Sequence, residues 1–201
     1  MIKYIRYAAT PILVLFGIYF AMKGQYWMWV YEAIFTLIVI FGDLFLGDDR
    51  SRPEYAAPKL LNFFLYINLP LLFTILAISV WMSGSLPLPA WGASLMATRE
   101  ETTFIHLVGY VDVLGLMVAT AGTNVGHELT HRKRNRFDMF MGNWLLALTW
   151  DCSFAIEHVY GHHKYVATSI DPATAKRGQN PYHFILRAIF LNQRNAWIIE
   201  N

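Results

Sequence analysis

The sequence predicts an all-α integral membrane protein, a bundle of about four complete transmembrane helices with additional interfacial helices. Composition is the first observation behind this fold class: hydrophobic residues make up 56% of the 201 residues and charged residues only 15%. Soluble domains usually contain roughly 25% charged residues. The second observation is that four apolar stretches approach the ~20 residues that a helix needs to cross a bilayer. A bilayer is therefore the expected solvent for most of the chain.

The four apolar stretches lie at about residues 8–22, 27–46, 60–82 and 104–124. Because the first is short, we expect it to lie partly in the membrane interface. The segment GDDRSRPE separates the second stretch from the third, and SGSLPLPAWGAS separates the third from the fourth. Both are rich in turn formers and are expected to be loops. No small-residue cleavage site clearly follows the first stretch, so we expect an uncleaved span and no signal peptide.

Lysine and arginine residues predict the orientation of these helices. They cluster in the connections on one side, at Lys3 and Arg6, at Arg50, Arg52 and Lys59, and at Arg132, Lys133, Arg134 and Arg136. The alternate connections hold only Lys23 and Arg99. Because cytoplasmic loops carry the excess of positive charge, we expect the N-terminus and residues 125–136 in the cytoplasm.

Charge and cysteine content exclude two kinds of site. The net charge of +2 is too small, and the basic residues too scattered, to indicate a nucleic-acid partner. Cys152 is the only cysteine, so the chain forms no intrachain disulfide and cannot build a thiolate metal cage alone. Imidazole and carboxylate groups must therefore supply any metal ligands.

Residues 137–156 resemble a fifth span but are expected to form an interfacial or re-entrant helix pair. Polar and aromatic residues interrupt their apolar character, namely Asp138, Asn143, Trp144, Trp150 and Asp151. If the segment crossed the bilayer, the histidines before and after it would lie ~30 Å apart and could not share a metal. A further amphipathic segment begins near Phe184 and continues to Asn201.

Five of the seven histidines fall in two motifs, GHELTHR at 126–132 and EHVYGHHK at 157–164. On a helix, residues four apart share a face with Cβ atoms ~5–6 Å apart, close enough to reach one ion or two neighbouring ions. Clustered imidazoles without a metal would each need a hydrogen-bond partner, and their protonation would create repelling cations. The motifs therefore predict metal ligands at His127, His131, His158, His162 and His163. The lone His106 and His183 are expected to be satisfied polar residues at helix ends.

The sequence leaves more than one metal open. HELTH matches H-E-x-x-H, in which two histidines bind zinc and Glu128 would be the base of a metalloprotease. Catalytic zinc needs three protein ligands and an open position, so the three histidines of the second motif exceed its needs. Two metals explain the surplus better, and imidazole and carboxylate donors suit iron, copper or zinc. A non-haem di-iron centre with open positions for dioxygen is the favoured hypothesis, and a non-catalytic metal store or sensor is a further alternative.

Three carboxylates are candidates to support this site. Glu128 and Glu157 stand next to predicted ligands and are expected to orient imidazoles, unless they are solvated charges at the membrane boundary. Asp112 lies inside the fourth span, where an ionisable group is costly. We expect it to contact an asparagine or histidine near the site, with helix packing as the alternative.

The segments HELTHR, EHVYGHHKYVAT and DPATAKRG resemble the first two histidine boxes, and the linker after the second, of the integral-membrane alkane 1-monooxygenase and xylene monooxygenase family of the fatty acid desaturase-like superfamily. This resemblance implies a six-span fold in the bacterial inner membrane, with two non-haem iron ions on its cytoplasmic side. It also implies that a rubredoxin or ferredoxin, with its reductase, supplies electrons for hydroxylating a terminal methyl group of a hydrophobic alkyl substrate. The five clustered histidines would be iron ligands.

The chain departs from the family pattern in two respects. The family has a further histidine and a third histidine box beyond the second box, and residues 1–201, read as a single membrane domain, contain neither. We therefore expect a fragment that by itself neither holds both irons nor turns over. The expected Thr-Pro-Glu-Asp-Pro is TSIDP at 168–172, so the substrate type stays open and a fatty acid desaturase is the main alternative. The substrate channel is expected to run between the spans, lined by residues such as Trp27, Phe35, Leu114 and Met117.

Overall fold

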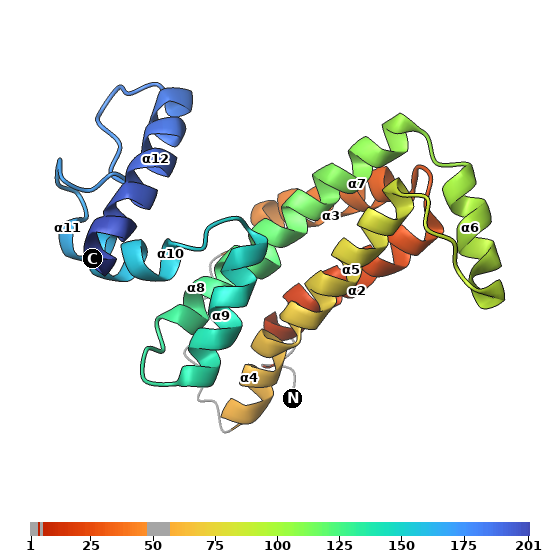
Figure 1. Ribbon diagram of the computed structural model, residues 1–201, viewed down its shortest axis with the longest axis horizontal. Helices are drawn as coiled ribbons and strands as arrows, with labels where there is room; N and C mark the ends of the chain where they lie inside the picture. Colours follow the sequence, from red (N-terminus) through yellow and green to blue (C-terminus); the bar gives the residue numbers. More distant parts are fainter. Residues whose placement is uncertain (1–3, 5, 48–56) are drawn as a thin grey trace. The chain divides into compact units, whose positions relative to one another are not determined.

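The computed structural model describes residue 4 and residues 6–47 and 57–201. This part of the chain contains helices and no strand, which confirms the all-α prediction. It divides into two compact units, one ending at Gly122 and the other comprising Thr123–Asn201. Figure 1 shows the helices of each unit. Most of the predicted loop GDDRSRPE, with Arg50 and Arg52, lies outside the described residues.

The first unit is built from six α-helices among its described residues. They are α2 (Ala9–Lys23), α3 (Trp27–Phe45), α4 (Pro58–Tyr66), α5 (Asn68–Ser83), α6 (Ala93–Glu100) and α7 (Phe104–Met117). Helix α2 packs along α5, and α3 packs along α7. Buried Val14, Met28, Ile75 and Val113 contribute to the shared core. Two buried tyrosines tie helices together, because the Tyr31 hydroxyl donates to the Leu13 carbonyl at 3.2 Å and the Tyr110 hydroxyl donates to the Ala21 carbonyl.

Three of the four predicted spans are long and apolar enough to cross a membrane. They are Trp27–Phe45, Pro58–Ser83 and Phe104–Thr130. The first predicted stretch corresponds to α2, which has 15 residues. At ~1.5 Å per residue such a helix is shorter than the ~30 Å hydrocarbon core. This length agrees with the expectation that the first stretch lies partly in the interface.

The connection between α5 and α7 contains more structure than the predicted loop. A 3₁₀ turn (Ala90–Gly92) and the start of α6 fall within SGSLPLPAWGAS. The Arg99 guanidinium lies 4.4 Å from the centroid of the Trp81 ring and donates to the Leu86 carbonyl at 2.6 Å. The Trp81 indole donates to the same carbonyl at 2.8 Å. These tertiary contacts, which local sequence does not reveal, fold the connection back against the end of α5.

The second unit begins with a helical hairpin of α8 (Asn124–Thr130) and α9 (Arg136–Leu148), which lie side by side in Figure 1. The Asn135 side chain caps α9 by accepting from the amides of Phe137 and Asp138. Two glycines bring the helix backbones together, because a Cβ at Gly126 would lie 3.1 Å from the Gly142 carbonyl oxygen. Small residues allow this close approach between helices.

Helix α9 explains why residues 137–156 need not cross the bilayer. It has 13 residues, which at ~1.5 Å per residue falls well short of the ~30 Å hydrocarbon core. The chain then reverses through Trp150, whose φ is 61° and whose side chain is 93% exposed. The helical segments α10 (Phe154–Ile156), η4 (Glu157–His162) and α11 (His163–Tyr165) follow, and these segments support the interfacial or re-entrant interpretation.

The last helix of the second unit is α12 (Pro181–Glu200), which corresponds to the amphipathic segment predicted near Phe184. Asn180 caps it by accepting from the amides of Tyr182 and His183, and Pro181 occupies the first helical position, where its missing N–H costs nothing. Helix α12 packs against η4 and α10. It therefore lies beside the segment that carries the second histidine motif.

The glycine contact between α8 and α9 predicts a sharp difference between two alanine substitutions. A Cβ at Gly142 would lie 3.1 Å from the Gly126 carbonyl oxygen and 2.9 Å from Thr130 Cγ2, so Gly142→Ala has to push backbone apart. We expect a loss of about 1–3 kcal/mol, seen as a lower thermal unfolding midpoint in detergent. A Cβ at Gly115 meets nothing within 4 Å, so Gly115→Ala should leave the midpoint unchanged or raise it. Equal midpoints for the two variants would contradict the close helix contact.

Candidate metal centre

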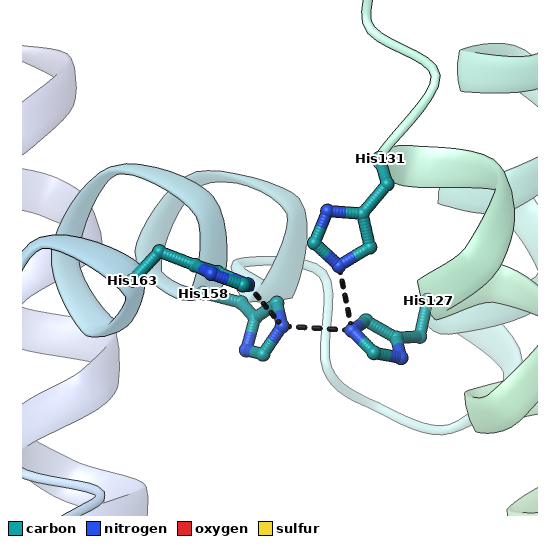
Figure 2. A group of neighbouring side chains, drawn as sticks. All are labelled: His127, His131, His158 and His163. Atoms are coloured by element: carbon teal, nitrogen blue, oxygen red, sulfur yellow. Dashed lines mark hydrogen bonds between the residues drawn. The ribbon is translucent and has the colours of Figure 1, made fainter. Parts of the chain in front are cut away.

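Four of the five predicted ligands converge on one point of the second unit, as Figure 2 shows. The Nε2 atoms of His131 and His127 lie 2.7 Å apart, those of His127 and His158 lie 2.8 Å apart, and those of His158 and His163 lie 3.0 Å apart. One nitrogen from each ring lies within 4.8 Å of one from every other ring. The two motifs, separated by about thirty residues in the sequence, thus form one group.

Local helix geometry selects which histidines meet. His127 and His131 are four residues apart at the end of α8 and share a face, as predicted. Segment η4 is a π-helix, in which hydrogen bonds join residues five apart. This winding brings the Nε2 atom of His158 within 3.0 Å of that of His163, five residues later. The rings of His158 and His162 also stack, so the pair predicted from a spacing of four does share a face. The π-helix and the pairing of His158 with His163 were not predicted, because α-helical periodicity gives no sign of them.

The donor set fits a bound cation. A neutral imidazole nitrogen carries either one hydrogen or one lone pair, so four Nε2 atoms in mutual contact cannot all form good hydrogen bonds with one another. Two ligands at right angles around one ion, each ~2.1 Å from it, lie about 3 Å apart, close to the three observed contacts. A cation that accepts all four lone pairs would resolve the conflict.

The surroundings lower the pKa of two of these imidazoles, those of His131 and His158. Burial, followed by the neighbouring imidazoles of His127 and His163, lowers the pKa of His158 to about 4. Burial and the same kind of neighbours also lower the pKa of His131. Neutral imidazole is the form that binds metals. Both side chains are therefore ready to ligate at neutral pH without first losing a proton.

His162, the fifth predicted ligand, lies beside this group with a different partner. Its ring stacks on that of His158, with centroids 5.3 Å apart. Its Nδ1 lies 2.9 Å from Oδ2 of Asp171, a residue only 1% exposed. A carboxylate on one imidazole nitrogen fixes the tautomer and leaves the other nitrogen free for a metal. His162 is therefore held in the form that a ligand needs, although its role as a ligand stays a prediction.

Asp171 is a functional candidate that the reasoning from sequence missed. Its Oδ1 accepts from the Ala173 amide at 2.9 Å, and its Oδ2 accepts from the Thr174 hydroxyl. Burial acts to raise the pKa of the Asp171 carboxyl, but these hydrogen bonds and His162 outweigh it, so the pKa lies below its usual value. The sequence signal that could have identified Asp171 is DPAT at 171–174. In it the aspartate is followed, after one proline, by Ala173 and Thr174, whose donors it can bind. The carboxylate is therefore charged and rigidly held.

The structure gives the two glutamates different environments. Glu128 is exposed and forms a salt bridge with Arg132 one helical turn later, at 2.9 Å. Glu157 is buried, and its Oε1 has no hydrogen-bond partner. It lines a small polar cavity of about 120 Å³ together with His158, His162 and Asn192. Burial, followed by the charge of Asp171, raises the pKa of Glu157. Of the two, Glu157 has the surroundings of a residue that supports the site.

Other predicted residues lie in the first unit. Asp112 is on α7, where its charge acts on Glu32 of α3, and its expected contact near the histidines stays a prediction. Of the proposed channel residues, Met117 is buried in the core, Phe35 and Leu114 are half-buried and Trp27 is exposed. The lone His106 lies at a helix end as expected, and its Nδ1 accepts from the Thr103 amide at 3.0 Å. The expectation that it is fully satisfied is wrong, because its buried Nε2 has no hydrogen-bond partner among the described residues. His183, in the second unit, lies near Gln179 at the start of α12.

Comparison with known proteins finds a matching family and several similar proteins. Residues 102–201 match the fatty acid desaturase family. The chain is 33% identical to alkane 1-monooxygenase 1 of Alcanivorax borkumensis, over 98% of this chain and 46% of that protein. It is 32% identical to an alkane 1-monooxygenase of Ectopseudomonas oleovorans, over 92% of this chain and 41% of that protein.

A further relative is the xylene/toluene monooxygenase hydroxylase component XylM of Pseudomonas putida, which is 28% identical over 98% of this chain and 49% of its own length. The chain thus spans less than half the length of these relatives. The similarities confirm the predicted resemblance to alkane and xylene monooxygenases, and they cover both histidine motifs.

The central place of His158 in the group predicts the result of a metal titration. Because its Nε2 contacts those of both His127 and His163, His158→Ala should weaken binding of Co²⁺ by more than the ~10–100-fold that loss of an outer partner costs. Binding would be followed by visible absorption of the protein in detergent. His183→Ala, which removes an exposed imidazole outside the group, is the control. Wild-type affinity in His158→Ala would contradict a shared ligand group.

Proposed function

Residues 102–201 of the chain belong to the fatty acid desaturase family, and from this membership we propose that the protein acts as an integral-membrane non-haem di-iron monooxygenase. Its substrate would be an alkane or related hydrophobic molecule, hydroxylated at a terminal methyl or alkyl group. The convergence of four imidazole nitrogens from both motifs supports this function most strongly. Relatives over most of the chain that are named alkane 1-monooxygenases point to the same reaction.

The histidines are suited to hold the iron ions. His127, His131, His158 and His163 would supply one group of nitrogen ligands. His162, whose Nδ1 is bound to Asp171, keeps Nε2 available for a second ion. Imidazole donors suit iron as well as copper and zinc. When bound, two iron ions would supply the activation of dioxygen that attack on an unactivated C–H bond requires.

The remaining groups of the chain would prepare this site. Asp171 holds His162 in one tautomer, and the lowered pKa of His158 keeps its lone pair available. An alkyl substrate offers no charge or hydrogen bond to grip, so shape and access through lipid must select it. The apolar helices Trp27–Phe45, Pro58–Ser83 and Phe104–Thr130 provide the hydrocarbon surroundings from which such a molecule would enter.

The electron donor would be a rubredoxin or ferredoxin, reduced by its reductase, on the cytoplasmic side of a bacterial inner membrane. Exposed cationic side chains lie close in sequence to the histidines: Lys133, Arg134 and Arg136 follow the first motif, and Lys164 belongs to the second. The Lys133 ammonium lies 4.2 Å from the centroid of the Tyr160 ring. A basic surface attracts an acidic partner and accelerates its association. The same residues also satisfy the positive-inside rule.

A fatty acid desaturase is the second candidate, and the match of residues 102–201 favours it. It would use the same ligands but remove two hydrogens from an acyl chain. A zinc protease using HELTH is disfavoured by the position of Glu128, which is paired with Arg132 on the exposed side of α8. The base of such a protease would have to act on a zinc-bound water.

Product analysis under ¹⁸O₂ tests the function. Membranes with the protein, expressed from its complete coding sequence, would receive a series of n-alkanes, rubredoxin, its reductase and NADH. We expect a primary alcohol that contains one ¹⁸O atom, because R–CH₃, O₂, two electrons and two protons yield R–CH₂OH and water. His158→Ala is the inactive control.

The same experiment separates the alternatives. An alkene without ¹⁸O, formed from a fatty acyl substrate, would replace the hydroxylase with a desaturase. One zinc ion per chain, with no oxygenated product from any alkane, would contradict the di-iron proposal. Cleavage of a peptide substrate that is lost in Glu128→Gln would support the protease.

A further inference from the structure

We propose that Arg187 of α12 is a positioning residue for the metal centre. It clamps the turn that carries Asp171, and Asp171 in turn holds His162. The inference rests on the proposed function in one respect, namely that His162 serves as a metal ligand. It concerns a basic residue that lies 24 positions after the last histidine of the second motif and that no feature of the histidine motifs identifies.

Among the described residues, Arg187 directs its hydrogen bonds to the main chain of that turn. One guanidinium nitrogen, Nη2, donates to the Pro172 carbonyl at 3.2 Å and to the Thr174 carbonyl at 3.0 Å. The two carbonyls stand on either side of Ala173, whose amide donates to Asp171 Oδ1 at 2.9 Å. The guanidinium thus binds two carbonyls of the turn, while the Asp171 carboxylate binds the amide between them.

The turn is tied to the rest of its loop through Asp171 and Thr174. The Thr174 hydroxyl donates to Asp171 Oδ2 and accepts from the Ala167 amide at 3.0 Å. The Thr174 amide donates to the Asp171 carbonyl at 3.2 Å. The loop between α11 and α12, residues 166–180, has no regular helix or strand to stabilise it. Segments of this kind open at low free energy unless tertiary contacts hold them, and Arg187 supplies such a contact from a stable helix.

The choice of arginine fits this position. Arg187 is half-buried, and its guanidinium also lies 5.7 Å from the centroid of the Phe184 ring on its own helix. Hydrogen bonds from a charged donor to carbonyls are stronger than those between neutral groups. An ordinary membrane-facing position would not retain such a charge. The two carbonyls therefore account for a cation on the inward face of α12.

The packing of α12 extends the same brace to the segment that carries His158. Glu157 immediately precedes His158 in η4, and α12 packs along η4. One helix therefore holds both the segment of His158 and, through Arg187, the loop that orients His162.

The test compares Arg187→Leu with Arg187→Lys in the whole protein, using hydrogen–deuterium exchange and Co²⁺ titration. Arg194→Leu is the matched control, because Arg194 is an exposed arginine on the same helix. His162→Ala first identifies the cobalt equivalent that depends on His162. In Arg187→Leu we expect faster exchange in peptides covering residues 166–180 and ~10–100-fold weaker binding of that equivalent, the range for loss of an outer-shell partner. Arg187→Lys should restore part of the protection from exchange and part of the cobalt affinity, and Arg194→Leu should match the wild type in both measurements.

Several results would overturn the proposal. A folded Arg187→Leu protein with wild-type exchange and cobalt affinity would show that no clamp exists. Faster exchange with unchanged affinity would show that the clamp does not position a ligand. If His162→Ala loses no cobalt, the ligand assignment within the proposed function fails too, whereas unchanged exchange in Arg187→Leu overturns the clamp alone. Should Arg187→Leu not fold, Arg187→Gln, which is too short to reach both carbonyls, tests the same two readouts.

Discussion

The second unit depends on one constraint, which is that four imidazole nitrogens from two distant motifs lie within 4.8 Å of one another. Two segments meet at a point only if the chain between them returns to its starting side. Helix α9 is short enough for this return, and the glycine pair Gly126 and Gly142 lets it lie directly against α8. A bilayer-crossing segment of ~20 residues in this position would have separated the motifs. The histidine group and the topology of residues 123–165 are therefore a single structural requirement.

The sequence predicted the helical class, three of the spans and the set of clustered histidines, because each is a pattern of local composition or spacing. What the sequence did not predict is the helical winding within the second motif, and with it the pairing of His158 with His163. An α-helix pairs residues four apart, whereas the π-helical turn of η4 pairs His158 with His163, five apart. A π-helix forms when tertiary contacts outweigh the loss of regular hydrogen bonding, and nothing in the local sequence reports those contacts. Helix α6 was missed for the same reason, since its Arg99 contacts Trp81 and the Leu86 carbonyl, which lie outside the helix.

The carboxylates of Glu128 and Asp171 illustrate the difference between residues adjacent in sequence and residues adjacent in space. Glu128 stands next to a ligand but turns to Arg132 and to solvent. Asp171 stands eight residues after the last histidine of the second motif, and its carboxylate lies 2.9 Å from His162. Burial alone would oppose the charge of Asp171, but donors from its own turn offset that cost. A charged carboxylate in such a turn orients an imidazole more rigidly than a solvated neighbour could.

Helix α12 has polar side chains on its inward face and large apolar side chains among its exposed positions. Its inward face carries Arg187, Asn192 and Asn195, whereas its exposed positions include Phe190 and Trp197, each 72% exposed. In water such a distribution would leave large apolar surfaces unprotected and polar groups buried. A buried polar group must find a partner inside the protein, and Arg187 finds its partners in the carbonyls of Pro172 and Thr174. The arginine that reduces the hydropathy of α12 is thus the residue that holds the Asp171 turn, so this contact and the weak resemblance of the helix to a membrane span have one physical origin.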